Sequence, residues 1–90
     1  MGDTILLSCN ATQTSGVKWS RNTTRYGFSY VYINGTARGR EDFRKRLSVI
    51  NVGTMEIYNV HPVDSGFYDC YEANGTRIIG YHLVAKRMFF

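Results

Sequence analysis

The two cysteines, Cys9 and Cys70, lie near opposite ends of this 90-residue chain and constrain its fold more than any other feature. Neither belongs to a Cys-x-x-Cys pair, and His61 and His82 lack the paired spacing of a zinc-binding motif, so a zinc site is the weaker interpretation. A disulfide that closes the long loop between the cysteines would stabilise so small a domain by about 4 kcal/mol. Because disulfides persist in oxidising compartments, the cysteines favour an extracellular protein.

Four Asn-x-Thr sequons point to the same secretory route, with acceptor residues Asn10, Asn22, Asn34 and Asn74. The chain shows no signal peptide, and no apolar run approaches the length of a membrane span. We therefore interpret it as a segment of a longer parent protein, either secreted or held at the cell surface by an anchor outside this segment.

The residue pattern is typical of an all-β domain. Short runs rich in Tyr, Val, Ile, Phe and Thr are separated by Gly, Asn, Ser and Asp. Roughly eight strands with regular turn signals favour a sandwich of two sheets in a single domain, residues 1–90. Strands are expected around Cys9 and Trp19 and over residues 28–33, 46–50, 54–60, 66–73 and 76–85. Asn34-Gly35 and Asn74-Gly75 are expected to form hairpin turns, since both residues of each pair accept positive φ.

The order Cys9, Trp19, Cys70 and the run Asp-Ser-Gly-Phe-Tyr-Asp-Cys at residues 64–70 resemble the V-set (variable-type) immunoglobulin domains. The resemblance extends over residues 2–85. It implies an immunoglobulin-like Greek-key β-sandwich of two antiparallel sheets, joined by one disulfide that packs against Trp19.

The same resemblance implies structural roles for four further residues. Tyr68 would form the tyrosine corner, in which its hydroxyl ties a turn to the backbone. Gly66 would allow a close approach of two backbone segments, and Asp64 would pair with Arg46. We expect these residues to stabilise the fold and not to bind a ligand.

Three departures from the family separate this chain from antibody and T-cell-receptor domains. The first strand that normally precedes Gly2 is expected to be missing or truncated, and residues 86–90 form a possible stem or tail. The family's Trp-Tyr-x-Gln stretch is Trp-Ser-Arg-Asn at residues 19–22, and no Phe-Gly-x-Gly motif follows Gly80.

Exposed tyrosines are the most informative candidates for binding. Tyrosine offers a large contact area at low entropic cost, so an outward aromatic row indicates an interface. The residues expected to face outward and contact a partner are Tyr30, Tyr32, Phe67, Asp69 and Tyr71. The alternative is a set of cross-strand aromatic ladders on a solvated sheet.

The basic stretch Arg38, Arg40, Arg44, Lys45 and Arg46 is interpreted as a solvated face, with binding of heparan-type glycans or acidic partner surfaces as the alternative. Nucleic acid is not an expected partner, because no nucleic-acid-binding module is recognisable. No nucleophile has a plausible base, so we expect neither an enzyme nor a cofactor or metal site.

The resemblance implies an extracellular recognition domain of a receptor or adhesion protein, which binds another cell-surface protein or a copy of itself and carries N-linked glycans. The alternatives are a secreted or viral glycoprotein that acts as a decoy or immune modulator, and a structural spacer with an evenly polar surface.

Overall fold

The computed structural model describes residues 3–9, 16–50 and 53–85 of the chain. Eight strands account for most of these residues. They are β1 (Ile5–Leu7), β2 (Val17–Thr23), β3 (Gly27–Ile33), β4 (Thr36–Ala37), β5 (Leu47–Ile50), β6 (Thr54–Ile57), β7 (Gly66–Glu72) and β8 (Arg77–Leu83). A short helix, α1 (Glu41–Arg44), precedes β5, and a 3-10 turn, η1 (Pro62–Asp64), precedes β7.

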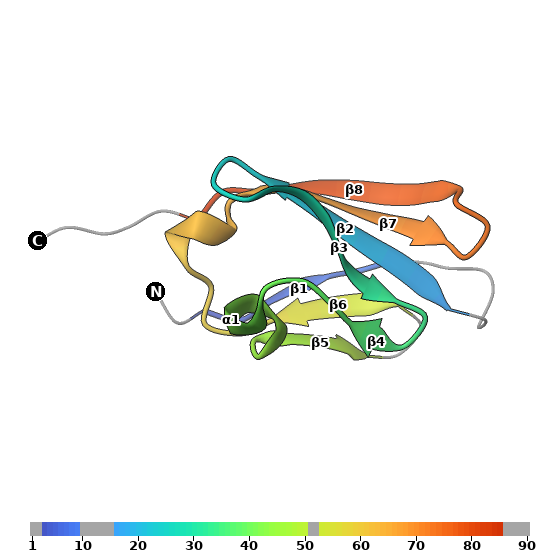
Figure 1. Ribbon diagram of the computed structural model, residues 1–90, viewed down its shortest axis with the longest axis horizontal. Coiled ribbons are helices and arrows are strands. Elements are labelled where there is room, and N and C mark those ends of the chain that lie inside the picture. The colour runs from blue at the N-terminus through green and yellow to red at the C-terminus, as the bar shows by residue number, and fades with distance from the viewer. Residues whose placement is uncertain (1–2, 10–15, 51–52, 86–90) are drawn as a thin grey trace, which may run out of the picture.

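The strands form two antiparallel sheets that pack face to face (Figure 1). The back sheet has the order β1-β6-β5, and the front sheet has the order β4-β3-β2-β7-β8. Cys9, just after β1, is bonded to Cys70 of β7, so the disulfide joins the two sheets. The predicted fold class, an immunoglobulin-like Greek-key β-sandwich with one inter-sheet disulfide, is confirmed.

The core lies between the sheets around Trp19. Trp19, Met55, Ile57 and Cys70 are fully buried, and in β6 the inward side chains are apolar while the outward ones are polar. The Trp19 indole Nε1–H donates to the Gly53 carbonyl oxygen at 2.8 Å, so its polar atom is satisfied inside the core. Tyr81 stacks on Trp19 with a ring-centroid distance of 6.3 Å, which places this tyrosine on the core side of β8.

Asp64 is the polar anchor of the turn between the two sheets. Its carboxylate accepts hydrogen bonds from both terminal nitrogens of Arg46, at 2.8 and 3.0 Å, and from the His61 N–H at 2.8 Å. The hydroxyl of Tyr68 donates to the Asp64 backbone carbonyl, which is the tyrosine corner expected from the sequence. The Arg46–Asp64 pair is therefore present, and it secures the start of β7.

Gly66 begins β7 where the backbone passes very close to β2. Its φ is +157°, and an added Cβ would lie 2.3 Å from the Asn22 carbonyl oxygen and 2.9 Å from the Thr23 Cα. Only glycine fits this position, because the obstructing atoms belong to the backbone of a central strand.

The two Asn-Gly turns differ from each other. Asn34 and Gly35 both have positive φ, 47° and 89°, as predicted for a two-residue hairpin turn. The same prediction for Asn74-Gly75 is wrong, because only Gly75 has positive φ there. The Gly75 N–H donates to the Glu72 carbonyl oxygen, so residues 73 and 74 form the centre of this longer turn.

Candidate interaction surface

The front face, defined here as the side of the front sheet turned away from the core, holds most of the exposed aromatic side chains. The pairing registers of β2, β3, β7 and β8 place the outward side chains of the front face in three rows across the strands. The first row is Phe28, Asn22, Phe67 and His82; the second is Tyr30, Ser20, Asp69 and Gly80; the third is Lys18, Tyr71 and Arg77.

An aromatic cluster crosses three strands of this face. Phe28 and Tyr30 meet edge to face at 5.3 Å, and Tyr30 meets Tyr71 edge to face at 6.3 Å. Tyr30 and Tyr71 belong to β3 and β7, the strands on either side of β2, so they meet over β2. The small side chain of Ser20 between them makes this contact possible, and it is only 1% exposed although it points away from the core.

A second group lies on β7 and β8. Phe67 stacks on His82 with centroids 4.5 Å apart and an interplanar angle of 17°. Arg77 Nε donates to Asp69 Oδ1 at 2.8 Å. This ion pair lies over Gly80, where an added Cβ would come within 2.0 Å of Arg77 Nη2, so the absence of a side chain at Gly80 provides its space.

The expectation that Tyr32 shares the outward face with Tyr30 is wrong. A β-bulge lies between the pairs Trp19–Tyr32 and Ser20–Tyr30, and Val31 is the extra residue. Tyr32 therefore lies opposite the core residue Trp19 and packs against the core cluster.

The other four expected contact residues all lie on the front face. Tyr30 and Phe67 are exposed, while Asp69 and Tyr71 are half-buried within it. Sequence reasoning missed Phe28, Arg77 and His82 as members of the same face. The alternation of β3 places Phe28 beside Tyr30, so this residue could have been found from its parity.

The outer surface of the back sheet is different in character. Its outward row consists of Leu6, Glu56 and Ser48, one from each strand. Strands β1, β5 and β6 contain no aromatic residue. Tyr58, which follows β6 and donates to Glu56, is exposed as well, but the other exposed aromatic side chains of the described residues lie on the front face.

Several side chains of the basic stretch around α1 form ion pairs with acidic residues of the same molecule. Arg40 lies 3.4 Å from Asp42, and Lys45 lies 3.6 Å from Glu41. The guanidinium of Arg46 is used by Asp64. These neighbours reduce the positive charge available to an anionic glycan and favour the interpretation as a solvated face.

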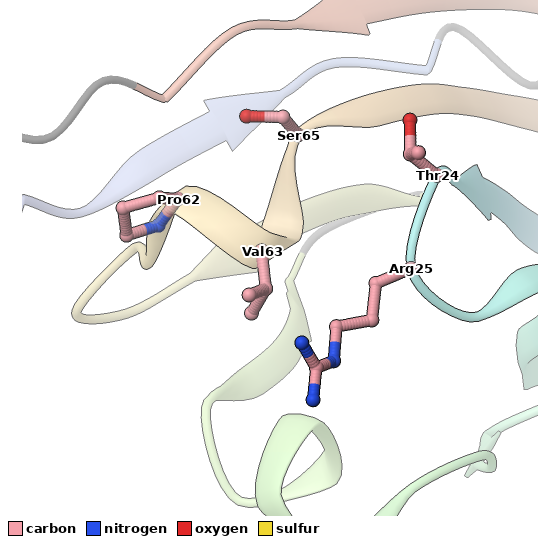
Figure 2. A pocket seen from close by; sticks show the side chains of 5 residues that line it. All are labelled: Thr24, Arg25, Pro62, Val63 and Ser65. Atoms are coloured by element: carbon pink, nitrogen blue, oxygen red, sulfur yellow. The ribbon is translucent and has the colours of Figure 1, made fainter.

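A hollow lies between the β2–β3 turn and η1, lined by Thr24, Arg25, Pro62, Val63 and Ser65 (Figure 2). The Ser65 hydroxyl is already bonded to the backbone of Ala85. It donates to the Ala85 carbonyl oxygen at 3.2 Å and accepts from the Ala85 N–H at 2.9 Å. Arg25 is the one charged side chain in the lining, and Figure 2 shows it directed away from Ser65 towards α1. Such a lining has too few convergent polar groups to define a small-molecule site.

Three of the four sequon asparagines lie in the described residues, and all three are exposed. Asn34 and Asn74 occupy the β3–β4 and β7–β8 turns, at the right-hand end of the sandwich in Figure 1. Asn22 lies in the first row of the front face, near the opposite end. Asn10 lies outside the described residues.

Within the described residues, no group of three or more His, Cys, Asp and Glu side chains is placed to hold a metal ion. None of the helices in this part of the chain is long and apolar enough to cross a membrane. No protein-family profile matches the sequence, and no curated protein is significantly similar to it.

Proposed function

We propose that this chain is a V-set immunoglobulin domain of an extracellular receptor or adhesion protein, and that it binds a protein partner through its front face. The observation that carries the proposal is the continuous aromatic cluster Phe28–Tyr30–Tyr71 on one outer surface of the sandwich. The strands of the opposite sheet contain no aromatic residue.

The assignment to the V-set is supported by the sheet order. Variable-type domains add two strands to the sheet that contains the second cysteine. Here β3 and β4 extend the sheet that contains Cys70 in the same way. The disulfide, the buried Trp19 and the Tyr68 corner support the same assignment.

The chemistry of the front face favours a protein partner. Interface centres are enriched in tyrosine, phenylalanine and arginine, and a few such residues carry most of the binding free energy. Tyr30 and Tyr71 support each other through their ring contact, so little side-chain freedom would be lost on binding. The Asp69–Arg77 pair beside them offers both charges to a partner.

The experiment compares two double variants of the secreted domain. Tyr30→Ala/Tyr71→Ala removes the cluster, and Leu6→Ala/Glu56→Ala truncates two outward side chains of the back sheet. Each is displayed on a multimeric scaffold and tested for binding to a panel of cells and to an immobilised copy of the wild-type domain. We expect the front-face variant to lose at least tenfold in binding and the back-sheet variant to bind as the wild type does. The proposal fails if the back-sheet variant loses binding and the front-face variant retains it, or if the wild type binds nothing.

A further inference from the structure

The sequon at Asn22 lies in a strand, in contrast to the turn positions of Asn34 and Asn74. Asn22 is exposed and points to the front face, while the next residue, Thr23, is buried. Thr24, the sequon hydroxyl residue, is exposed at the beginning of the β2–β3 turn. A group attached to Asn22 would therefore leave the sheet from the first row of its front face.

Asn22 has a phenylalanine on either side. Its cross-strand partners are Phe28 on β3 and Phe67 on β7. These rings are 56% and 54% exposed, more than any other Phe, Tyr or Trp side chain among the described residues. Burying an exposed phenylalanine ring is favourable, so a group that covers the two rings beside Asn22 would be stabilised by them.

A sugar is suited to cover them. The ring of N-acetylglucosamine has an apolar face of C–H groups, which carry partial positive charge and are attracted to the negative face of an aromatic ring. Neighbouring strands are about 4.8 Å apart, so the rings on both sides lie within reach of the first sugar on Asn22. His82, stacked on Phe67, extends the same platform.

We propose that an N-linked glycan on Asn22 packs back onto the front face and covers Phe28 and Phe67. This proposal rests on the secretory, glycosylated character of the domain in the function proposed above. The donor is a lipid-pyrophosphate-linked oligosaccharide: Nδ2 of Asn22 forms a bond to C1 of its first N-acetylglucosamine, the C1–O bond to the pyrophosphate breaks, and Nδ2 loses one proton.

The glycan also restricts where a partner docks. The first row lies near the β2–β3 turn, and the third row, with Tyr71 and Arg77, lies next to the β7–β8 turn at the other end of the sheet (Figure 1). With the first row covered, a partner contacts the end of the front face formed by Tyr30, Tyr71 and Arg77.

The test uses a matched pair of variants that keep Asn22 itself. Thr24→Ser preserves the sequon and Thr24→Ala destroys it. Both are secreted from eukaryotic cells, and glycopeptide mass mapping reads occupancy at all four asparagines. Both are also refolded from bacteria, which supply no glycan.

We expect Asn22 to be occupied in Thr24→Ser, and this variant to melt about 4 °C or more above Thr24→Ala, a shift typical of one stacking contact in a domain of this size. The same two variants refolded from bacteria should have equal melting temperatures. Adding Phe28→Ala/Phe67→Ala should abolish the difference between the two secreted proteins.

Two results would overturn the inference alone: Asn22 bare while Asn34 and Asn74 are occupied, or Asn22 occupied with no difference in melting temperature. If instead no sequon is occupied in the secreted protein, the glycoprotein part of the proposed function fails as well.

Discussion

Arg21 and Asp64 form an ion pair inside the sandwich, with Arg21 Nη1 3.4 Å from Asp64 Oδ1 and with exposed fractions of 3% and 1%. The guanidinium of Arg21 also lies 3.8 Å from the centre of the Phe43 ring, a cation–π contact that helps to compensate its loss of water. Because Arg46 approaches the same carboxylate, Asp64 balances two arginines. Its removal would leave a buried positive charge without a counter-ion.

Replacing Asp64 with alanine should therefore destabilise the domain severely. Breaking a buried ion pair by removing one partner typically costs about 3–5 kcal/mol, a large part of the stability of a small domain. Denaturant unfolding of Asp64→Ala measures this loss. Asp69→Ala is the matched control, because its pair with Arg77 lies at the surface and should change stability by less than about 1 kcal/mol. Equal losses in the two variants would contradict this account.

The same carboxylate should make stability depend on acid pH. Burial raises the pKa of Asp64, but hydrogen bonds from Arg46 and the His61 N–H, together with the charges of both arginines, outweigh burial and hold the pKa below its ordinary value of 3.8. The unfolded chain therefore takes up this proton first as pH falls below about 4, and the stabilisation disappears as pH passes through the lower pKa of the folded state. The difference in unfolding free energy between wild type and Asp64→Asn should shrink over this range, and a difference that stays constant from neutral pH to pH 2 would refute the assignment.

Tyr68 should produce a dependence at alkaline pH. Burial is the main cause that raises the pKa of its hydroxyl from 10.0 to about 12. The raised pKa stabilises the fold fully below pH 10, and this contribution is lost between pH 10 and 12, by about 1.4 kcal/mol per pH unit, as the unfolded tyrosine ionises first.

Tyr68→Phe provides the comparison for this effect. At pH 8 it should be less stable than wild type by about 1 kcal/mol, because it lacks the hydrogen bond to the Asp64 carbonyl. Near pH 11 the order should reverse, because the wild type has then lost about as much stability as the hydrogen bond contributes and phenylalanine does not ionise. Parallel stability curves for the two proteins up to pH 12 would rule out this role of the buried hydroxyl.

Two glycines offer a further contrast. Gly66→Ala should cost about 2 kcal/mol or more, because the new Cβ would meet the backbone of β2 and the residue has positive φ. Gly80→Ala should cost less than about 1 kcal/mol, because its new Cβ meets the movable ends of Arg77 and Asp69. Thermal unfolding of both variants shows which one loses more stability. Gly80→Ala would lose more than Gly66→Ala if the Arg77–Asp69 pair were a major source of stability.

Alternation along single strands made much of this architecture predictable. The parity of β7, counted from Cys70, places Tyr68 in the core and Phe67, Asp69 and Tyr71 on the front face, as the structure has them. The disulfide, Trp19 and the Arg46–Asp64 pair were predicted because each depends on residue types in a recognisable order.

The errors arose where one segment depends on another. Tyr32 was assigned to the wrong face because a bulge results from how β3 pairs with β2, which the sequence of β3 does not reveal. The turn at Asn74 was predicted from its dipeptide, but the hydrogen bond between Gly75 and Glu72 sets its length. Arg21 lies two residues after Trp19 in β2 and therefore points inward as well. Its charge can be buried there because it pairs with Asp64, which is far away in the sequence.

Val31, the extra residue of that bulge, is buried, yet it determines which side chains the domain presents to its surroundings. Side chains alternate along a strand, so pairing β3 with β2 without the bulge, while Tyr32 stays opposite Trp19, would turn the preceding part of β3 over. Phe28 and Tyr30 would move to the interior, and Ser29 would take their place outside. A buried residue thus determines the aromatic surface, because its bulge lets one strand turn Tyr32 to the core and Tyr30 to the outside.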